Sequence, residues 1–159
     1  HATMVRFSAD PGKAQSVVDL SPVYKGQAQS VQRGVALLPS GEVLIQDSLT
    51  GLKPGSTVRW GMITPGKPRK NEGGTLVLSQ NTKALTLQQL GAGAVQWQII
   101  DTAKPRNEWD SPNRGTLMVA MERQAPESGT VEIAVLMTPG GCRQSLAESL
   151  QLSPLSDWR

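Results

Sequence analysis

Residues 30–49 read SVQRGVALLPSGEVLIQDSL, and this stretch decides the fold class. Apolar and polar side chains alternate along its two halves with a period of two, which is typical of half-buried β-strands. Pro39-Ser40-Gly41 separates the halves, and these residue types favour a tight turn. The stretch therefore predicts a β-hairpin, in which two neighbouring strands run antiparallel.

The same alternation recurs along most of the chain, and turn-forming residues punctuate it. Turn residues at 71–74, 80–82, 91–93 and 127–129 predict further tight connections. About ten short strands joined in this way predict an all-β fold, an antiparallel β-sandwich with a short C-terminal tail. The apolar faces are Val31, Val35 and Leu37; Val58, Trp60 and Met62; Val95, Trp97 and Ile99; Leu117, Val119 and Met121; and Val131, Ile133, Val135 and Met137, with shorter strands at 5–8, 17–20, 43–46, 76–78 and 85–87.

Two basic, proline-containing segments interrupt this rhythm. Residues 64–73 (TPGKPRKNEG) and 101–114 (DTAKPRNEWDSPNR) predict long loops between strands. Residues 144–150 predict a short helix, after which the tail is expected to lie across a sheet, anchored by Trp158. The 159 residues contain no linker or repeat, so we expect residues 1–159 to form a single β-sandwich domain.

Charge and hydropathy narrow the class of partner. The net charge is +3, from 16 basic and 13 acidic residues that are spread along the chain, whereas a nucleic-acid binder concentrates its basic residues in one patch. The mild excess favours weak binding to an acidic polysaccharide. No apolar run approaches the roughly 18 residues that cross a bilayer, and no signal peptide is visible, so neither nucleic acid nor membrane is the expected partner.

The sequence offers little for catalysis. His1 is the only histidine and Cys142 the only cysteine, so a nucleophile–histidine site would depend on a chain end. No His, Cys, Asp or Glu cluster has metal-ligand spacing, and the Asp101, Glu108 and Asp110 carboxylates are read as those of a solvated loop. We therefore expect no catalytic residue, no metal and no cofactor in this chain.

The two basic segments supply the predicted substrate-binding residues. Trp109 can stack on the apolar face of a sugar ring, and it can equally cap an open end of the sandwich. Lys104 and Arg106 flank it and can pair with carboxylate or sulfate groups, as can Arg69 and Lys70 in the other segment. These five residues are the expected contacts to an acidic polysaccharide.

Two further polar residues are expected to be structural. Arg33 shares a strand face with Val31 and Val35, so either that face is open to solvent or Arg33 pairs with a buried acid such as Asp47. Tyr24 is the only tyrosine, and we expect it to be packed, with its hydroxyl bonded to the backbone.

Residues 17–49 (VVDLSPVYKGQAQSVQRGVALLPSGEVLIQDSL) resemble the C-terminal region of the heparinase II/III-like polysaccharide lyases. The resemblance is clearest up to Asp47, with weaker likeness in RFSADP (6–11) and VEIAVLMTP (131–139). It rests on a strand that ends in Asp-Leu-Thr, a nearby Ala-Tyr, an Ala, Ser and Arg that lead into a strand, and a hairpin that closes on Gln-Asp. The matching residues are Asp19-Leu20-Ser21, Tyr24, Ala28, Ser30, Arg33 and Gln46-Asp47, with Val23 in place of the alanine.

The resemblance implies the C-terminal β-sandwich of a two-part enzyme. Members join this sandwich to an N-terminal α/α-toroid, and the cleft between the two parts cleaves uronic-acid polymers by β-elimination. Catalytic Asn, His and Tyr residues lie mainly on the toroid, and a further His-Asn-Thr-like motif is not matched by His1-Ala2-Thr3. The zinc ligands of some members are not matched either. The resemblance thus implies a non-catalytic part of a periplasmic or extracellular lyase, which shapes or supports the cleft.

Two other kinds of protein compete with this interpretation. A stand-alone carbohydrate-binding module would show several exposed aromatic residues, whereas this chain has four Trp, one Tyr and one Phe, mostly at expected core positions. A protein-interaction sandwich would dock a partner on an open sheet face. A complete enzyme is the least favoured alternative, because no acid–base pair can be assembled from these residues.

Overall fold

The computed structural model describes residues 1–71, 74–91, 93, 96–104, 107–108, 111–140, 147 and 149–158. Within these residues the chain forms eleven β-strands and short 3₁₀ turns, so the all-β prediction is confirmed. Among the same residues, no helix has the length and apolar character needed to span a membrane.

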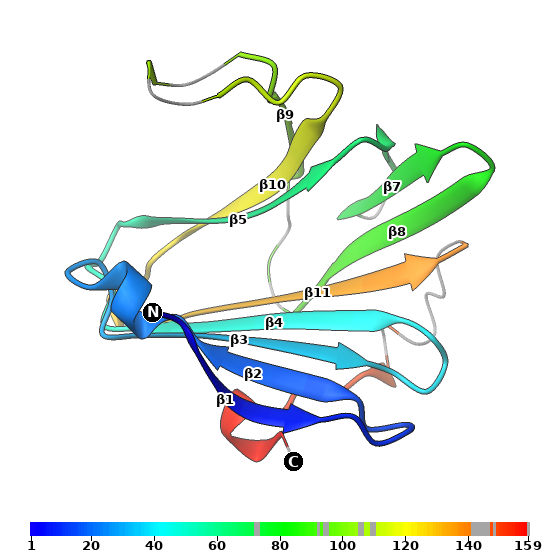
Figure 1. Cartoon of the computed structure of the whole chain (residues 1–159). Helices are drawn as coiled ribbons and strands as arrows, with labels where there is room; N and C mark the ends of the chain where they lie inside the picture. Colours follow the sequence, from blue (N-terminus) through cyan, green and yellow to red (C-terminus); the bar gives the residue numbers. More distant parts are fainter. Residues whose placement is uncertain are drawn as a thin grey trace.

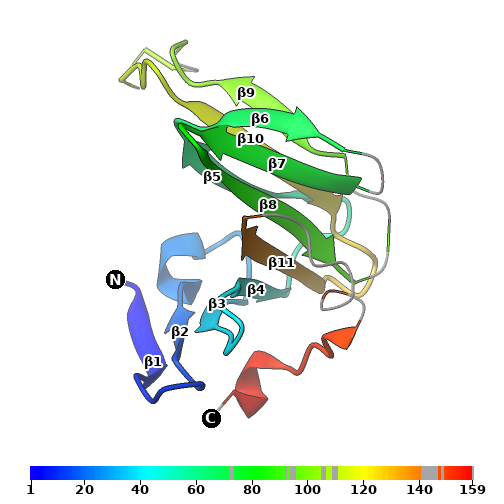
Figure 2. The same cartoon turned by 90° about the vertical axis from the view of Figure 1, so that its right-hand side faces the viewer.

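The strands form two antiparallel sheets that pack as a sandwich (Figure 1). The larger sheet has the order β1-β2-β3-β4-β11-β8-β7-β6, and the smaller has the order β5-β10-β9. Figure 2 shows that the smaller sheet lies against the part of the larger sheet that carries β6, β7 and β8, while β1 and β2 extend beyond it. The bounds are β1 Thr3–Ser8, β2 Gln15–Asp19, β3 Ser30–Leu37, β4 Val43–Thr50, β5 Thr57–Thr64, β6 Lys67–Lys70, β7 Thr75–Gln80, β8 Lys83–Leu90, β9 Gln98–Asp101, β10 Leu117–Gln124 and β11 Val131–Pro139.

The main core lies between the two sheets. The predicted inward faces of β3, β5, β10 and β11 all contribute to it, because alternate residues of a strand point to the same side. Trp60 and Trp97, both expected in the core, are 3% exposed and meet edge to face with ring centroids 6.0 Å apart. The Trp97 indole N–H donates to the Gly74 carbonyl at 2.8 Å, which satisfies its polar atom inside the core.

A second, smaller core covers the outer face of the larger sheet. The C-terminal tail supplies Leu155, from the 3₁₀ turn η3 (Leu155–Asp157), and the buried Trp158, which pack against Val17 and Leu44. The Arg6 guanidinium donates to the Leu155 carbonyl at 2.5 Å and fastens the tail to the edge strand. The tail that was predicted to cross a sheet does so, and Trp158 anchors it. Most of the helix predicted at 144–150 lies outside the described residues.

The prediction of a loop over residues 64–73 is wrong in part. Lys67–Lys70 forms β6, an edge strand that pairs only with β7. The strand lacks the alternation of apolar residues that predicts a strand, because its side chains are lysine, proline and arginine. Lysine and proline are usual on sheet edges, where one row of backbone groups faces solvent. The Asn71 N–H donates to the Thr75 carbonyl at 3.0 Å, and two residues of the tight connection predicted at 71–74 lie outside the described residues.

Two predicted turns fall where the chain passes from one sheet to the other. β8 of the larger sheet is followed along the chain by β9 of the smaller one, with the turn predicted at 91–93 only partly within the described residues, and residues 127–129 join β10 to β11. Sequence patterns mark where a strand stops, but they do not say which sheet the next strand enters. The strand expected around Val95, Trp97 and Ile99 begins only at Gln98, and Val95 lies outside the described residues.

Candidate functional site

A pocket of about 170 Å³ is lined by both sheets and by the turn that precedes β3. We call it the inter-sheet pocket. Its lining combines an apolar set with a polar set, so it offers both a surface for packing and groups for hydrogen bonding. The apolar residues are Leu20, Ala28, Val31, Leu49, Leu52, Val58 and Ile133, and the polar residues are Tyr24, Gln27, Arg33, Asp47, Thr57 and Arg59.

Tyr24 reaches the pocket because a short 3₁₀ turn, η1 (Ser21–Tyr24), follows β2. Asp19 organises this turn: its Oδ1 accepts from the Ser21 backbone N–H at 2.9 Å and from the Ser21 hydroxyl at 2.5 Å. The Ser21 oxygen in turn accepts from the Val31 N–H at 3.0 Å, which ties the turn to β3. The hydroxyl of Ser21, and then its N–H, lower the pKa of Asp19.

Tyr24 itself is not the packed residue that the sequence predicted. Its side chain is 40% exposed, and its hydroxyl makes no hydrogen bond to any residue that the structure describes. The prediction is wrong because the turn projects the ring over the pocket instead of into the core. Tyr24 therefore lines the pocket with a side chain that is partly open to solvent.

Arg33 and Asp47 form a bidentate ion pair across β3 and β4. The two residues are direct partners in the strand register, with Arg33 Nε 2.6 Å from Asp47 Oδ1 and Nη2 2.7 Å from Oδ2. The Asp47 side chain is 9% exposed and that of Arg33 is 40% exposed. The bond to Asp47 raises the pKa of Arg33. Both alternatives left by the sequence are therefore realised: Arg33 pairs with a buried acid, and its face is partly open to solvent.

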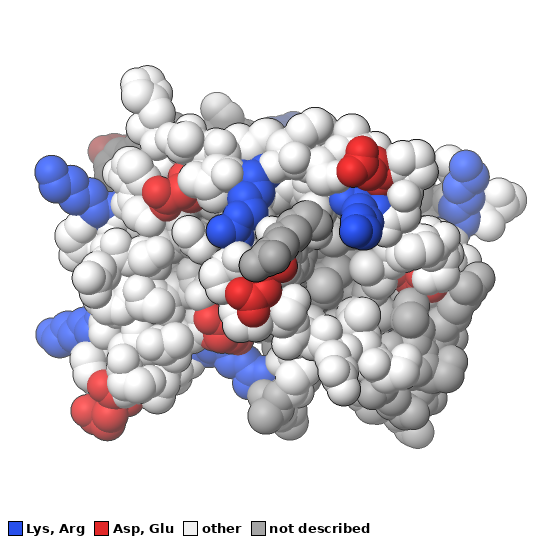
Figure 3. Space-filling model, turned by 90° about the horizontal axis from the view of Figure 1, so that it is seen from below, with Lys and Arg blue, Asp and Glu red and all other residues white. Residues whose placement is uncertain are grey.

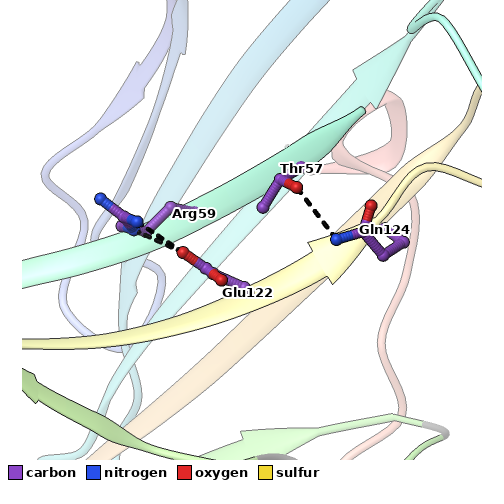
Figure 4. A network of polar contacts seen from close by, with 4 residues as sticks. All are labelled: Thr57, Arg59, Glu122 and Gln124. Atoms are coloured by element: carbon purple, nitrogen blue, oxygen red, sulfur yellow. Dashed lines mark hydrogen bonds and ion pairs between the residues drawn. The ribbon is translucent and has the colours of Figure 1, made fainter. Parts of the chain in front are cut away.

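A second polar network lies on β5 and β10, shown in Figure 4. Arg59 donates through Nε and Nη2 to one carboxylate oxygen of Glu122, at 2.8 and 2.6 Å. The Gln124 amide donates to the Thr57 hydroxyl oxygen at 2.9 Å. Thr57 and Arg59 alternate along β5 with Val58 and Trp60, which face the core, so this network lies on the outer face of the smaller sheet, although both residues border the inter-sheet pocket.

The predicted substrate-binding residues lie elsewhere. Arg69 and Lys70 are exposed neighbours on the edge strand β6, and Lys104 is exposed beyond the end of β9. None of these three residues lines the inter-sheet pocket. Arg106 and Trp109 lie outside the described residues, as does Asp110. The five residues therefore stay a prediction, to which the structure adds the exposure of three of them.

The inter-sheet pocket was not predicted from the sequence, although most of its lining residues belong to predicted strands or to the segment 17–47. Seven residues of the 17–47 segment line the pocket: Leu20, Tyr24, Gln27, Ala28, Val31, Arg33 and Asp47. The signal was their concentration within one short segment. What could not be seen in the sequence was that β5, much later in the chain, closes the same space with Thr57 and Arg59.

Charge is dispersed on the face of the molecule that Figure 3 shows. On the face in Figure 3, Lys and Arg side chains stand apart from one another, with Asp and Glu between them. Across the described ranges, no group of three or more His, Cys, Asp or Glu residues is arranged to hold a metal ion. The inter-sheet pocket differs from the other hollows of the described surface in that an ion pair, Arg33 with Asp47, lies in its lining.

Comparison with known proteins identifies the fold. No family model and no curated protein matches the chain, whereas solved structures do. A heparinase III is similar over 87% of this chain, with a TM-score of 0.64 and 15% identity, and the match covers 21% of that enzyme. The heparan sulfate lyase HepC from Pedobacter heparinus is similar over 90% of this chain, with a TM-score of 0.64 and 13% identity, and the match covers 22% of its length.

The chain thus spans about a fifth of the length of the enzymes it matches. At this level of identity the likeness establishes the fold. The resemblance inferred from residues 17–49 is confirmed to that extent: the chain has a β-sandwich fold found within heparinase III and HepC.

Proposed function

We propose that this chain is an accessory β-domain of a polysaccharide-lyase-type enzyme, which supports one wall of a saccharide cleft without performing the elimination. The observation that carries the proposal is the likeness of fold to a heparinase III and to a heparan sulfate lyase over 87% and 90% of the chain. The single histidine and single tyrosine of the sequence support a non-catalytic role, since such residues usually provide the acid and base.

The proposed ligand is an acidic polysaccharide, bound weakly through the basic edges of the sandwich. Arg69 and Lys70 project from β6, and Lys104 follows β9, so both basic segments present cations to solvent. Together with Arg106 and Trp109 they form the proposed polymer contacts. Long-range attraction of this kind depends on salt, because exposed charges farther apart than about 8 Å are screened at physiological ionic strength.

The test mixes the full chain with heparin, heparan sulfate, alginate and hyaluronan. Absorbance of the unsaturated uronate reports elimination, and calorimetry reports binding. We expect no new absorbance and weak, salt-sensitive binding, which Arg69→Gln combined with Lys70→Gln and Lys104→Gln reduces. The matched control is Lys13→Gln with Lys25→Gln and Lys53→Gln, which removes the same charge from exposed positions elsewhere. Appearance of unsaturated product would refute the non-catalytic role, and absence of binding to every polymer would refute the polysaccharide contact.

A specific observation also favours protein docking on the larger sheet. Phe7 is 68% exposed, and the strand register places it opposite Ser16, which lies opposite Val35, so these side chains share the face that carries Arg33. An apolar side chain so exposed beside the end of the smaller sheet is suited to a covering partner. The partner we propose is an α/α-toroid of the same enzyme, in the periplasm or outside the cell.

The reading frame that encodes the chain tests this partner. We expect it to extend upstream through a region of long amphipathic helices. A stop codon followed by a native start at Met4 would contradict the toroid and would favour a stand-alone module.

A further inference from the structure

The smaller sheet ends at β5, and the outer edge of this strand is open. β5 pairs with β10 along all eight of its residues, and within the described residues no backbone hydrogen bond joins β5 to any other strand. In an edge strand, alternate N–H and C=O groups point away from the sheet and are free to pair with a further strand. The edge of β5 is therefore a place where an extended chain can be added.

The other three edge strands carry features that hinder such pairing. The register of β1 shifts between Met4 and Arg6, β6 has four residues and contains Pro68 among three cations, and β9 has four residues. Proteins protect sheet edges by bulges, prolines, lysines and short strands. β5 is instead eight residues long, regular in its pairing, and free of proline and lysine. Its one charged residue, Arg59, is bound to Glu122 on the outer face.

Two hollows follow β5 along its length. Residues 57–59 line the inter-sheet pocket, and residues 62–64 line a second hollow of about 280 Å³. The larger sheet faces β5 across both: β3 and β4 border the inter-sheet pocket, and β7 and β8 border the second hollow (Figure 1). None of the described lining residues belongs to β9 or β10, so both hollows lie between the edge strand and the larger sheet. We call the two hollows together the β5 groove.

The β5 groove has an apolar lining that is incompletely covered. The apolar residues include Val31, Leu49 and Val58 in the inter-sheet pocket and Met62, Leu78 and Leu85 in the second hollow. Three of them, Val58, Met62 and Leu85, are only partly buried. A strand added beside β5 would place every second side chain toward this lining, because side chains alternate between the two faces of a sheet. The segment that fits is therefore extended, with apolar residues at alternate positions.

The exposed charge of the groove is positive. In the inter-sheet pocket Arg33 is paired with Asp47, whose side chain is 9% exposed, and Arg59 is paired with Glu122. Lys83, in the second hollow, is exposed and forms no ion pair with any residue that the structure describes. Complementary charge favours a partner that carries an acidic residue at this end of the groove.

A second copy of the chain fits this edge poorly. Two copies joined through antiparallel β5 strands would be related by a twofold axis perpendicular to the sheet, so that their larger sheets would lie on the same side. In each copy β1 and β2 extend beyond the smaller sheet (Figure 2). These overhanging strands would meet beneath the joint. A single extended segment avoids this overlap.

We propose that the β5 groove binds an extended peptide segment as an added strand antiparallel to β5, with apolar residues at alternate positions and an acidic residue beside Lys83. The inference goes beyond the proposed function, because the partner is a polypeptide and not a polysaccharide. None of Phe7, Arg69, Lys70 and Lys104 lines the groove, so the surfaces proposed for the toroid and for the polymer are separate from it.

The experiment titrates the ¹⁵N-labelled full chain with a peptide of the length of β5, EVTITVTS, blocked at both ends. An antiparallel strand places the N-terminal glutamate of this peptide beside the end of β5 that borders Lys83. We expect the amide resonances of residues 57–64 to shift and their hydrogen exchange to slow, while the amides of β9, at the other edge of the same sheet, stay unchanged. Absence of binding, or changes confined to β1, β6 or β9, would overturn the proposal.

Two altered peptides test the mode of binding. EVTPTVTS has a proline that removes a central N–H and cannot continue a ladder, so it should bind at least tenfold more weakly. KVTITVTS reverses the charge and should bind about threefold more weakly, as is usual for an exposed charge pair. Equal affinity of the proline peptide would show binding without strand pairing and would refute the added strand.

A charge reversal in the chain tests the position of the acidic residue. Lys83→Glu should weaken the binding of EVTITVTS about threefold and strengthen that of KVTITVTS. The matched control is Lys13→Glu, which makes the same change in the exposed turn after β1 and should leave both affinities unchanged. Thermal unfolding confirms that each variant is folded. Unchanged affinities in Lys83→Glu would refute the charge assignment.

The state of the free chain decides between a peptide and a second copy. We expect a monomer by analytical ultracentrifugation, with fast hydrogen exchange at the open edge of β5. A dimer whose β5 amides are protected without any peptide would overturn the choice of partner.

Discussion

Arg33 and Asp47 face each other across β3 and β4, and their two hydrogen bonds join a carboxylate that is 9% exposed to a guanidinium that is 40% exposed. The Asp47 carboxylate is thus buried in the sheet, while the Arg33 guanidinium still reaches the inter-sheet pocket. This asymmetry lets one ion pair contribute to stability and present donors at the same time.

Removal of the buried partner should be costly. Asp47→Ala leaves the Arg33 charge without its partner, and breaking a buried ion pair costs roughly 3–5 kcal/mol. Because Arg33 is partly solvated, we expect a loss of about 2–3 kcal/mol in the free energy of unfolding, measured by urea denaturation. The control is Glu122→Ala, which breaks the more exposed pair with Arg59 and should cost about 0.2–1 kcal/mol. Equal losses in the two variants would contradict the difference in burial.

The stability that Asp19 contributes should depend on pH. The hydrogen bonds from Ser21 lower the pKa of Asp19 below its ordinary value of 3.8, so the folded chain favours the charged carboxylate. This contribution is complete above pH 3.8 and is lost as the pH falls through the lower pKa of the folded state. Asp19→Asn should therefore lower the urea midpoint at neutral pH, and the difference from the parent chain should shrink as the pH falls below 3.8.

The control for Asp19 is Asp10→Asn in the exposed turn after β1. No described residue donates a hydrogen bond to the Asp10 side chain, so its replacement should leave the urea midpoint nearly unchanged at neutral pH. A midpoint difference for Asp19→Asn that is the same at neutral pH and at about pH 2 would contradict the linkage.

A buried hydroxyl on β8 should be replaceable with a gain in stability. Thr86 is 1% exposed, and its Oγ1 has no hydrogen-bond partner among the described residues. Thr86→Val keeps the shape and removes the unsatisfied group, so we expect the free energy of unfolding to rise by about 1 kcal/mol. In the control, Thr102→Val removes a hydroxyl that lies 2.7 Å from the Thr116 carbonyl, and stability should fall by about 1 kcal/mol. A loss of stability in Thr86→Val would show that its hydroxyl is satisfied in solution.

Local pattern predicted the strands but not their partners. Period-two alternation located β3, β4, β5, β10 and β11, because the side chains that face the main core recur at every second residue. It failed for β6, whose side chains, KPRK, are those of an edge that faces solvent. The alternation also could not predict that β11 lies between β4 and β8, because pairing between strands that are distant in the sequence is not encoded in a local pattern.

The candidate site also has features that the sequence predicted and features that it did not. The ion pair between Arg33 and Asp47 was one of two predicted alternatives, since a charge on an apolar face calls for a partner. The exposure of Tyr24 was not predicted, because it depends on the turn that Asp19 and Ser21 build. Arg59 was not singled out at all: it joins the pocket only through the packing of one sheet on the other.

The contact between the tail and the sheet gives the last prediction. Gly34 on β3 lies beneath the C-terminal tail, and a Cβ atom at this position would approach the Leu155 side chain closely and lie 2.8 and 2.9 Å from two ring atoms of Trp158. Gly34→Ala should therefore displace the tail, with a loss of about 1–3 kcal/mol that is typical of overpacking. A change in the indole N–H resonance of Trp158 should accompany the loss. Gly61→Ala on β5 is the control, since the nearest contact of its Cβ would be the flexible Met118 side chain, 3.2 Å from the sulfur, and it should cost less. An unchanged Trp158 resonance in Gly34→Ala would show that the tail does not rest on β3.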